Sequence, residues 1–98
     1  MKFHLLKNIL EYGSFNQLNG HDEGITSIAI SADASTIFSG SADKTIRIWK
    51  TATGKCVRVL KGHSGFVMSI AISADASMIF SGSSDGTFRI WSYEIIDE

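Results

Sequence analysis

Three residue types that together can activate a nucleophile occur twice in this chain. His21, Ser39 and Asp43 could supply a base, a hydroxyl and an orienting carboxylate, as in the catalytic triad of a hydrolase. The same types return 42 residues later, as His63, Ser81 and Asp85. A catalytic triad is seldom duplicated in one chain, and neither serine lies in the Gly-x-Ser-x-Gly turn that exposes a nucleophile. A structural role is therefore favoured, and we expect no enzyme activity.

Other chemistry has weaker support in the sequence. The histidines and the single cysteine do not have the spacing of metal ligands, so we expect no metal site and no cofactor. Gly40-Ser41 and Gly82-Ser83 suit strands and turns better than a phosphate-binding loop. Cys56 has no partner for an internal disulfide, and we expect it to pack as a small hydrophobic residue.

Length and charge set further limits. A chain of 98 residues with 44% hydrophobic content could form one small domain. Its net charge of −1 gives no broad attraction to nucleic acid or to an anionic membrane. No apolar run reaches the ~18 residues of a transmembrane helix, and residues 2–7 are too short and too interrupted for a signal peptide. We expect a soluble, cytoplasmic protein.

An internal repeat sets the elements that must position these side chains. Residues 20–50 and 62–92 align with 21 identities in 31 positions. Runs of β-branched and apolar residues predict three strands in each unit and a fourth in the first unit. The predicted strands cover residues 25–31, 37–40, 45–49, 57–60, 67–73, 79–82 and 87–91. The first strand of each unit is apolar throughout, which predicts that it is covered on both faces.

The two units resemble the WD40 family. A Gly-His pair opens each unit and is followed at a fixed distance by a tryptophan, and the stretches SGSADKTIRIW and SGSSDGTFRIW are typical of that family. The resemblance covers residues 13–92 and implies an all-β chain of two β-propeller blades. It also implies a hydrogen-bonded network in each blade, running from Trp through Ser and His to Asp. The members would be His21, Ser39, Asp43, Trp49, His63, Ser81, Asp85 and Trp91.

Two departures separate the chain from the usual WD40 pattern. The closing Asp of the Trp-Asp pair is replaced by Lys50 in one unit and by Ser92 in the other. The usual Pro-Asp-Gly turn is replaced by Ala-Asp-Ala at residues 32–34 and 74–76. We expect neither departure to touch the residues that carry the fold.

The predicted strands divide unevenly between the two blades. Residues 20–61 form a complete first blade, whereas residues 62–98 leave little room for a fourth strand in the second. Residues 13–19 align with residues 55–61, which contain the fourth strand of the first blade. We therefore expect residues 13–19 to complete a blade of a neighbouring copy. The residues that would make this closure are Phe15, Asn16, Gln17 and Leu18.

Closure between copies predicts a cyclic homo-oligomer. Propellers usually have ~4–8 blades, and identical two-blade chains give only even numbers. The family resemblance points to six or more blades. A tetramer with eight blades is favoured over a trimer with six.

Residues 1–12 lie outside both units, and two structures remain open for them. Phe3, Leu6, Ile9 and Leu10 roughly fit a helical stripe, which would make the segment a helix or an irregular cap. Alternatively, residues 3–7 mimic the end of a third strand and are the remnant of a further blade.

The resemblance also implies a surface that engages a peptide or protein partner. It lies around the turn after each Gly-His pair and the residue before the conserved Asp. Phosphopeptide readers of the family carry Arg there, whereas this chain has Ala42 and Ser84, so phosphate recognition is disfavoured. A basic or apolar peptide would suit the rest of the surface, although packing between blades explains it at least as well. The candidate residues are Asp22, Glu23, Thr26, Ala42, Phe66, Met68 and Ser84.

Two functions therefore compete. The first is a non-enzymatic protein-interaction scaffold whose copies assemble into a propeller. The alternative is an engineered or truncated propeller building block with no partner other than itself. A pull-down with the assembled ring as bait would separate them.

Overall fold

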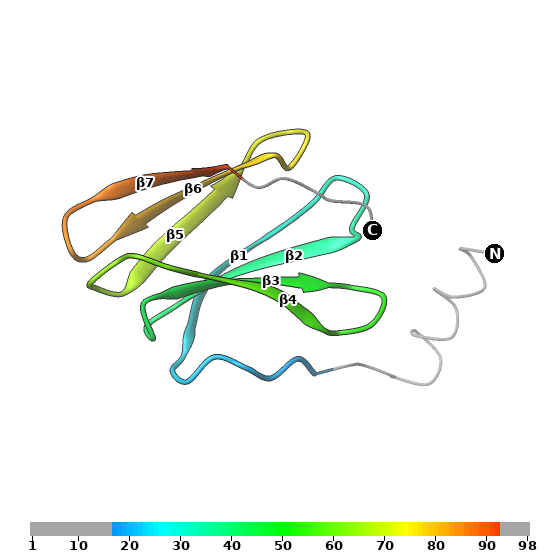
Figure 1. Cartoon of the computed structure of the whole chain (residues 1–98), viewed down its shortest axis with the longest axis horizontal. Coiled ribbons are helices and arrows are strands. Elements are labelled where there is room, and N and C mark those ends of the chain that lie inside the picture. Colours follow the sequence, from blue (N-terminus) through cyan, green and yellow to red (C-terminus); the bar gives the residue numbers. More distant parts are fainter. Residues whose placement is uncertain (1–16, 93–98) are drawn as a thin grey trace.

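The computed structural model describes residues 17–92, which form two antiparallel β-sheets (Figure 1). The first sheet contains β1 (Ile25–Ile30), β2 (Thr36–Ser41), β3 (Thr45–Lys50) and β4 (Cys56–Lys61). The second contains β5 (Val67–Ile72), β6 (Met78–Ser83) and β7 (Phe88–Ser92). Strands that follow one another along the chain are also neighbours in each sheet, so every sheet connection is a hairpin. The predicted all-β class with two blade-like sheets is confirmed. Residues 17–92 contain no helix that could cross a membrane.

The strands form in runs that are rich in β-branched and aromatic residues. Such residues fit a pleated, half-buried surface. In β2 and β3, Phe38 pairs with Ile48 and Ile37 pairs with Trp49. The second sheet repeats this register 42 residues later, since Phe80 pairs with Ile90. The observed strands match the predicted ones, and each strand begins and ends within one residue of its predicted bounds.

Several turns use a backbone conformation that glycine adopts most easily. Gly86, in the turn between β6 and β7, has a φ angle of 87°, and its equivalent Lys44 has a φ angle of 77°. Ala34 and Ala76 also have positive φ angles, of 63° and 61°. These alanines stand where the usual Pro-Asp-Gly turn has glycine, so this departure does bear on the fold, contrary to expectation. A side chain in this conformation costs roughly 1–2 kcal/mol.

Replacing Lys44 with glycine is expected to stabilise the protein by about 0.5–1 kcal/mol. The change relieves the positive φ angle of Lys44, and the greater freedom of glycine in the unfolded chain offsets part of the gain. Gly86→Lys is the matched variant and should destabilise. Urea unfolding of both variants checks the pair, and a Gly86→Lys variant at least as stable as the parent would contradict the explanation.

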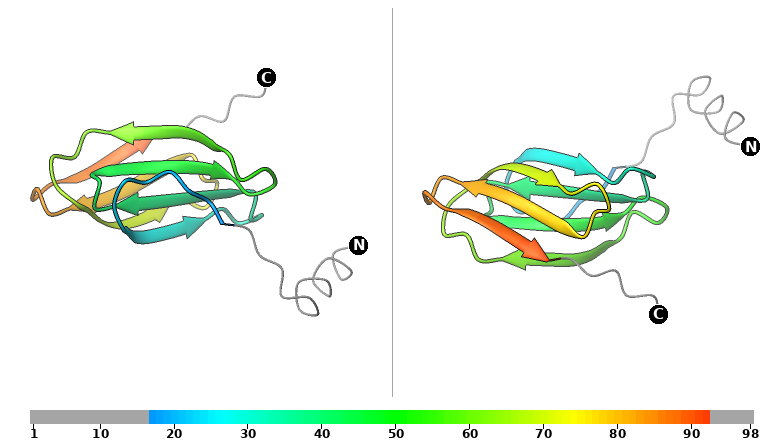
Figure 2. Two further views of the ribbon diagram at one scale, coloured as in Figure 1. Left: turned by 90° about the horizontal axis from the view of Figure 1, so that it is seen from below. Right: turned by 90° about the horizontal axis from the view of Figure 1, so that it is seen from above.

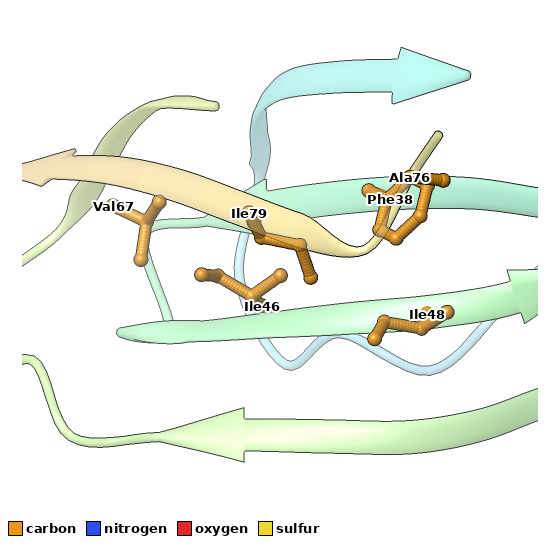
Figure 3. Packing of buried hydrophobic residues seen from close by; sticks show 6 residues of the cluster. All are labelled: Phe38, Ile46, Ile48, Val67, Ala76 and Ile79. Atoms are coloured by element: carbon orange, nitrogen blue, oxygen red, sulfur yellow. The ribbon is translucent and has the colours of Figure 1, made fainter. Parts of the chain in front are cut away.

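The core lies between the two sheets, which stack as two layers (Figure 2). β5 packs against β1 and β2. Phe38, Ile46 and Ile48 point from the first sheet toward the second (Figure 3). The second sheet contributes Val67, Ala76 and Ile79 to the same cluster. Burying a large apolar side chain stabilises by ~1.5–3 kcal/mol, so this cluster contributes strongly to holding the two sheets together.

The prediction that the first strand of each unit is covered on both faces is wrong for residues 17–92. β1 has a covered face toward the second sheet, but Ile28 and Ile30 on its other face are exposed. In β5, Val67 is buried while Met68 is exposed. The physical reason is that each sheet has only one neighbouring sheet among the described residues.

The structure describes only residues 17–19 of the predicted closure strand. Residues 17–19 lie outside any strand, and Leu18 packs close to Gly54 in the turn before β4. Phe15, Asn16 and the segment 1–12 lie outside the described residues. Exchange of residues 13–19 between copies therefore stays a prediction.

Candidate functional site

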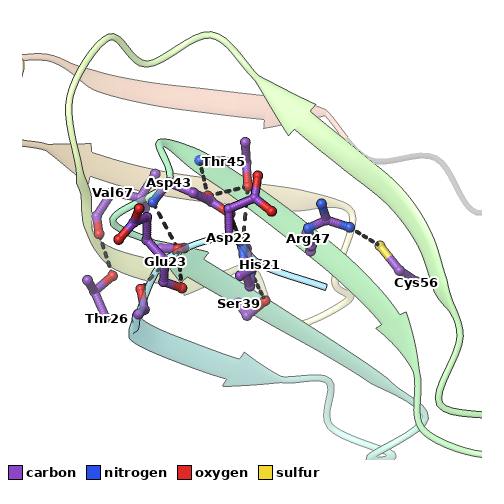
Figure 4. A network of polar contacts seen from close by, with 12 residues as sticks. His21, Asp22, Glu23, Thr26, Ser39, Asp43, Thr45, Arg47, Cys56 and Val67 are labelled. Carbon is purple, nitrogen blue, oxygen red and sulfur yellow. Dashed lines mark hydrogen bonds and ion pairs between the residues drawn. The ribbon is translucent and has the colours of Figure 1, made fainter. Parts of the chain in front are cut away.

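The three candidate triad residues of the first sheet lie next to one another (Figure 4). His21 precedes β1, Ser39 is in β2, and Asp43 is in the turn before β3. The Nδ1 atom of His21 lies 2.8 Å from Oδ2 of Asp43, and its Nε2 atom lies 2.6 Å from Oγ of Ser39. Trp49 donates from Nε1 to the same Ser39 Oγ at 2.8 Å. One chain of hydrogen bonds thus crosses the sheet from Trp49 to Asp43.

The second sheet contains the same arrangement. His63 Nδ1 lies 3.1 Å from Oδ2 of Asp85, and His63 Nε2 lies 2.8 Å from Oγ of Ser81. Trp91 donates from Nε1 to Ser81 Oγ at 2.8 Å. The structure therefore brings together all eight residues that the sequence suggested for two networks, four in each sheet.

Both network carboxylates stay charged to low pH. Burial is the largest influence on Asp43 and raises its pKa, but hydrogen bonds from Thr45 and His21 and from two backbone amides together hold the pKa well below its usual range. At Asp85 the Thr87 hydroxyl is the largest influence and lowers the pKa, with burial opposing it. A charged carboxylate only accepts hydrogen bonds, so the Nδ1 atom of each histidine carries the proton and donates it.

This protonation pattern leaves every member of the network paired. With its proton on Nδ1, His21 accepts at Nε2 from the Ser39 hydroxyl, and Ser39 in turn accepts from Trp49. The Ser39 and Ser81 residues are only 3% and 0% exposed. Each serine hydroxyl is already shared between a tryptophan and a histidine, so it is fully engaged within the network. The arrangement suits a polar tie that can be buried without unpaired donors, rather than an activated nucleophile.

Sequence reasoning missed two threonines that complete the networks. Thr45 donates from Oγ1 to Asp43 Oδ1 at 2.6 Å, and its backbone N–H donates to the same atom at 2.9 Å. Thr87 does the same at Asp85, at 2.5 and 2.8 Å. The signal was present, because a threonine follows two residues after the Asp in both units.

Cys56 departs from its expected role as a small hydrophobic residue. It is half-buried, and its Sγ atom accepts from Nη1 of Arg47 at 3.7 Å and donates to the carbonyl of Arg58 at 3.4 Å. Within residues 17–92, His, Cys, Asp and Glu side chains form no cluster that could hold a metal ion.

The candidate partner surface combines exposed side chains with residues whose hydrogen bonds hold the local structure. Asp22 and Glu23 are exposed in the turn before β1, and Phe66 and Met68 are exposed on either side of a buried residue in the second sheet. Thr26 is engaged, because its hydroxyl donates to the carbonyl of Val67 and so links the two sheets. Ala42 and Ser84 hold their loops through backbone N–H bonds to Gly24 and Phe66.

A match to a family model accompanies this geometry. The model described as WD domain, G-beta repeat matches residues 13–50 and 54–92. The chain belongs to the WD40 family. The two sheets are therefore WD40 blades, and the paired networks are their internal polar ties.

WD40 proteins with diverse names contain similar segments. The chain is 49% identical over 41 residues to a ribosome biogenesis protein BOP1 homolog of Monosiga brevicollis, covering 42% of this chain and 5% of that protein. It is 36% identical over 52 residues to the nuclear distribution protein nudF of Emericella nidulans, covering 52% and 12%. The solved structure of U3-55K superposes with a TM-score of 0.74 at 33% identity, covering 76% of this chain and 25% of that one. The chain thus spans a quarter or less of these relatives.

Acid is expected to destabilise these blades below about pH 4. Asp43 and Asp85 have lowered pKa values, as do the turn aspartates Asp33, at about 2, and Asp75, whose carboxylates accept from neighbouring serines. In the unfolded chain an Asp titrates near ~4, so the unfolded state binds protons first as pH falls. These carboxylates therefore stabilise the folded state fully above about pH 4. Their contribution falls progressively as the pH falls toward 2.

Urea midpoints measured at intervals from pH 5 to pH 2 check this expectation. An Asp33→Asn, Asp75→Asn double variant is the control, because it removes two of the titrating groups and should reduce the slope. A midpoint independent of pH over this window would contradict the assigned hydrogen bonds.

Proposed function

We propose that this chain is a non-enzymatic protein-interaction scaffold whose copies assemble into a closed β-propeller. Membership of the WD40 family supports the scaffold role, since such domains generally bind protein partners. The buried, fully paired serines support the non-enzymatic part of the proposal. The observation that carries assembly is the difference between the outer edges of the two blades.

Within residues 17–92, the first blade has a fourth strand at its outer edge and the second blade has none. β4 pairs with β3 from Thr45↔Lys61 to Trp49↔Cys56. β7 has no strand on its outer side within residues 17–92. An open edge presents unpaired backbone N–H and C=O groups, which favour pairing with another strand. A fourth strand on β7 would make the two blades equivalent.

Residues 13–19 of a neighbouring copy are the proposed fourth strand. They align with residues 55–61, and Leu18 takes the place of Leu60, which lies opposite Ile46 in the first blade. Phe88 is the residue of β7 that corresponds to Ile46. Each copy would then give one strand and receive one, which closes a ring when the rotation between copies fits. We favour a tetramer with eight blades over a trimer with six.

A second part of the proposal concerns the partner. Asp22 and Glu23 give the exposed turn before β1 a negative charge, and Phe66 and Met68 add exposed apolar surface at the same end of the strands. A basic peptide with apolar side chains would complement this combination. Failure of the assembled ring to retain any peptide of that composition would favour the alternative of a building block that binds only itself.

Sedimentation velocity over a concentration series tests the assembly. The proposal predicts one discrete species larger than the 10.7 kDa chain, with no population of larger open chains, because a closed ring leaves no free edge. A folded monomer at every concentration would overturn it.

A further inference from the structure

Within residues 17–92, each blade has one face that no other sheet covers, and apolar side chains are exposed on both of these faces. On the first blade this is the side away from the second blade, called here the front face, with Ile28, Ile30 and Ile37. On the second blade it is the side away from the first, called here the back face, with Phe80, Phe88 and Ile90. Ile28 and Ile30 are 59% and 51% exposed, and Phe88 and Ile90 are 65% and 58% exposed. Phe80 and Phe88 stack with ring centroids 6.3 Å apart.

The back face has the pattern of a face that is buried inside the chain. Phe80, Phe88 and Ile90 occupy the positions of Phe38, Ile46 and Ile48, the residues with which the first blade packs on the second. Ile46 and Ile48 are both 0% exposed, although Phe88 and Ile90 are largely exposed. The apolar side chains of the back face therefore match those that already bind a neighbouring blade.

The front face matches the other half of the same contact. Ile28, Ile30 and Ile37 occupy the positions of Ile70, Ile72 and Ile79, with which the second blade receives the first. Ile79 is completely buried in that contact. The front face contains a groove of about 140 Å³, lined mainly by apolar side chains. Its lining residues are Leu18, Ile25, Ile28, Ile37, Ser39 and Trp49.

A pair of glycines shows how closely the blades approach. A Cβ atom on Gly40 would lie 2.6 Å from Val67 Cγ1 and 3.0 Å from Ile70 Cδ1, both on the neighbouring blade. The equivalent glycine of the back face is Gly82, where a Cβ atom would meet only Ser69 Oγ, at 3.2 Å, within 4 Å. The back face therefore has a glycine where the internal contact brings a second blade very close, although Ser69 of its own blade also lies near this position.

The contact between copies would differ from the internal one at three positions. Phe88 stands in place of Ile46, and Ile25 stands in place of Val67, so both sides carry a larger side chain. The hydrogen bond from Thr26 to the Val67 carbonyl has no equivalent, because Met68 takes the place of Thr26. The contact between copies thus lacks one polar link that the internal contact has.

We propose that the back face of one copy packs on the front face of the next, in a head-to-tail contact that repeats the internal blade contact. This inference rests on the proposed self-assembly and names its contact surface. The partner is a second copy of this chain, because both halves of a contact that already exists inside the chain are exposed on its two sides. A head-to-tail contact uses different surfaces on the two partners, so it can close into a ring.

Two charge variants test which faces meet. Ile28→Lys disables the front face, and Ile90→Lys disables the back face, since a buried unpaired lysine is strongly unfavourable. Both residues are exposed in the single chain, so each variant should remain folded, as checked by circular dichroism. Ile28→Thr and Ile90→Thr replace them if a lysine variant fails to fold.

Sedimentation of each variant alone and of an equimolar mixture gives the answer. Each variant alone is expected to be monomeric, and the mixture is expected to form a 1:1 dimer that grows no further, because it retains one competent front face and one competent back face. A homodimer of either variant would overturn the proposal, since it would mean that like faces pair. A mixture that stays monomeric, at concentrations where the parent chain assembles, would also overturn it.

Gly82→Ala provides an independent variant with no charge. It is expected to change the unfolding midpoint of the monomer only slightly, because Ser69 Oγ alone lies within 4 Å of the added Cβ atom. It is expected to weaken assembly about tenfold in dissociation constant, because added atoms in a close-packed contact are costly. Unchanged assembly of Gly82→Ala and both lysine variants, with the parent chain assembled, would overturn this contact and leave exchange of residues 13–19 as the source of assembly. A parent chain that never assembles would overturn the proposed function itself.

Discussion

An Asp43→Ala variant is expected to lose about 2–4 kcal/mol of its free energy of unfolding. The carboxylate of Asp43 is only 7% exposed, and it accepts from His21 and from the hydroxyl and backbone amide of Thr45. Removing it leaves these donors without an acceptor inside the blade, at ~1–3 kcal/mol for each unsatisfied buried group. His21→Ala breaks the same chain of hydrogen bonds and should destabilise similarly. Urea unfolding measures both.

Asp22→Ala is the matched control for this loss. Asp22 is adjacent in sequence to His21 and exposed, and only its backbone N–H donates to Asp43, at 3.0 Å. Its stability should therefore stay close to that of the parent. Equal unfolding midpoints for Asp22→Ala and Asp43→Ala would show that the network does not hold the blade. A Ser39→Ala variant tests the hydrolase alternative. In a hydrolase this variant would remain folded and lose activity, whereas in a structural network it would be destabilised.

Deleting residues 1–19 is expected to abolish assembly while leaving both repeat units in place. The deletion removes the strand that we propose for the open edge of β7. Leu18 also packs near Gly54 and lines the groove on its own blade. The truncated chain must therefore be shown to fold, by its circular dichroism spectrum and a cooperative urea transition. Sedimentation velocity then reports its assembly state.

The outcome of this deletion separates strand exchange from a simple appendage. Addition of a peptide of residues 13–19 to the truncated chain should restore protection of the β7 backbone amides in hydrogen exchange. A truncated chain that still forms the same discrete ring would show that residues 1–19 are only an appendage. It would leave the contact between the front and back faces as the source of assembly.

Much of the fold was predictable because the sequence states it twice. The strand positions follow from runs such as residues 36–41 and 78–83, which keep the same residue types in the same order. The resemblance to the WD40 family also placed His21, Ser39, Asp43 and Trp49 in one network, and the structure has them within hydrogen-bond distance.

Backbone conformation was much harder to predict. Lys44, Ala34 and Ala76 have positive φ angles that their residue types disfavour. Only their alignment with glycine positions indicated this conformation, and the Ala-Asp-Ala turns were expected to be of no consequence. Ala76 moreover lies in the core between the blades. The contact that buries it joins residues from separate units, which a strand pattern within one unit does not specify.

The exposure of β1 could not be predicted from its composition. Ile25, Ile28 and Ile30 predict a strand that is covered on both faces, but the covering surface on one side is absent from residues 17–92. Composition records how much apolar surface a strand has to bury, whereas the identity of the covering element depends on assembly. The same limit applies to Phe88 and Ile90 on the other side.

Native mass spectrometry of the full chain tests the central claim most directly, because it counts the copies in the assembly. The chain has a mass of 10.7 kDa, so each additional copy is resolved. The account predicts a single closed species of four chains, with eight blades. A trimer would keep the closed ring and correct its size. A spectrum containing only the monomer, or an open-ended series of sizes, would contradict assembly into a closed propeller.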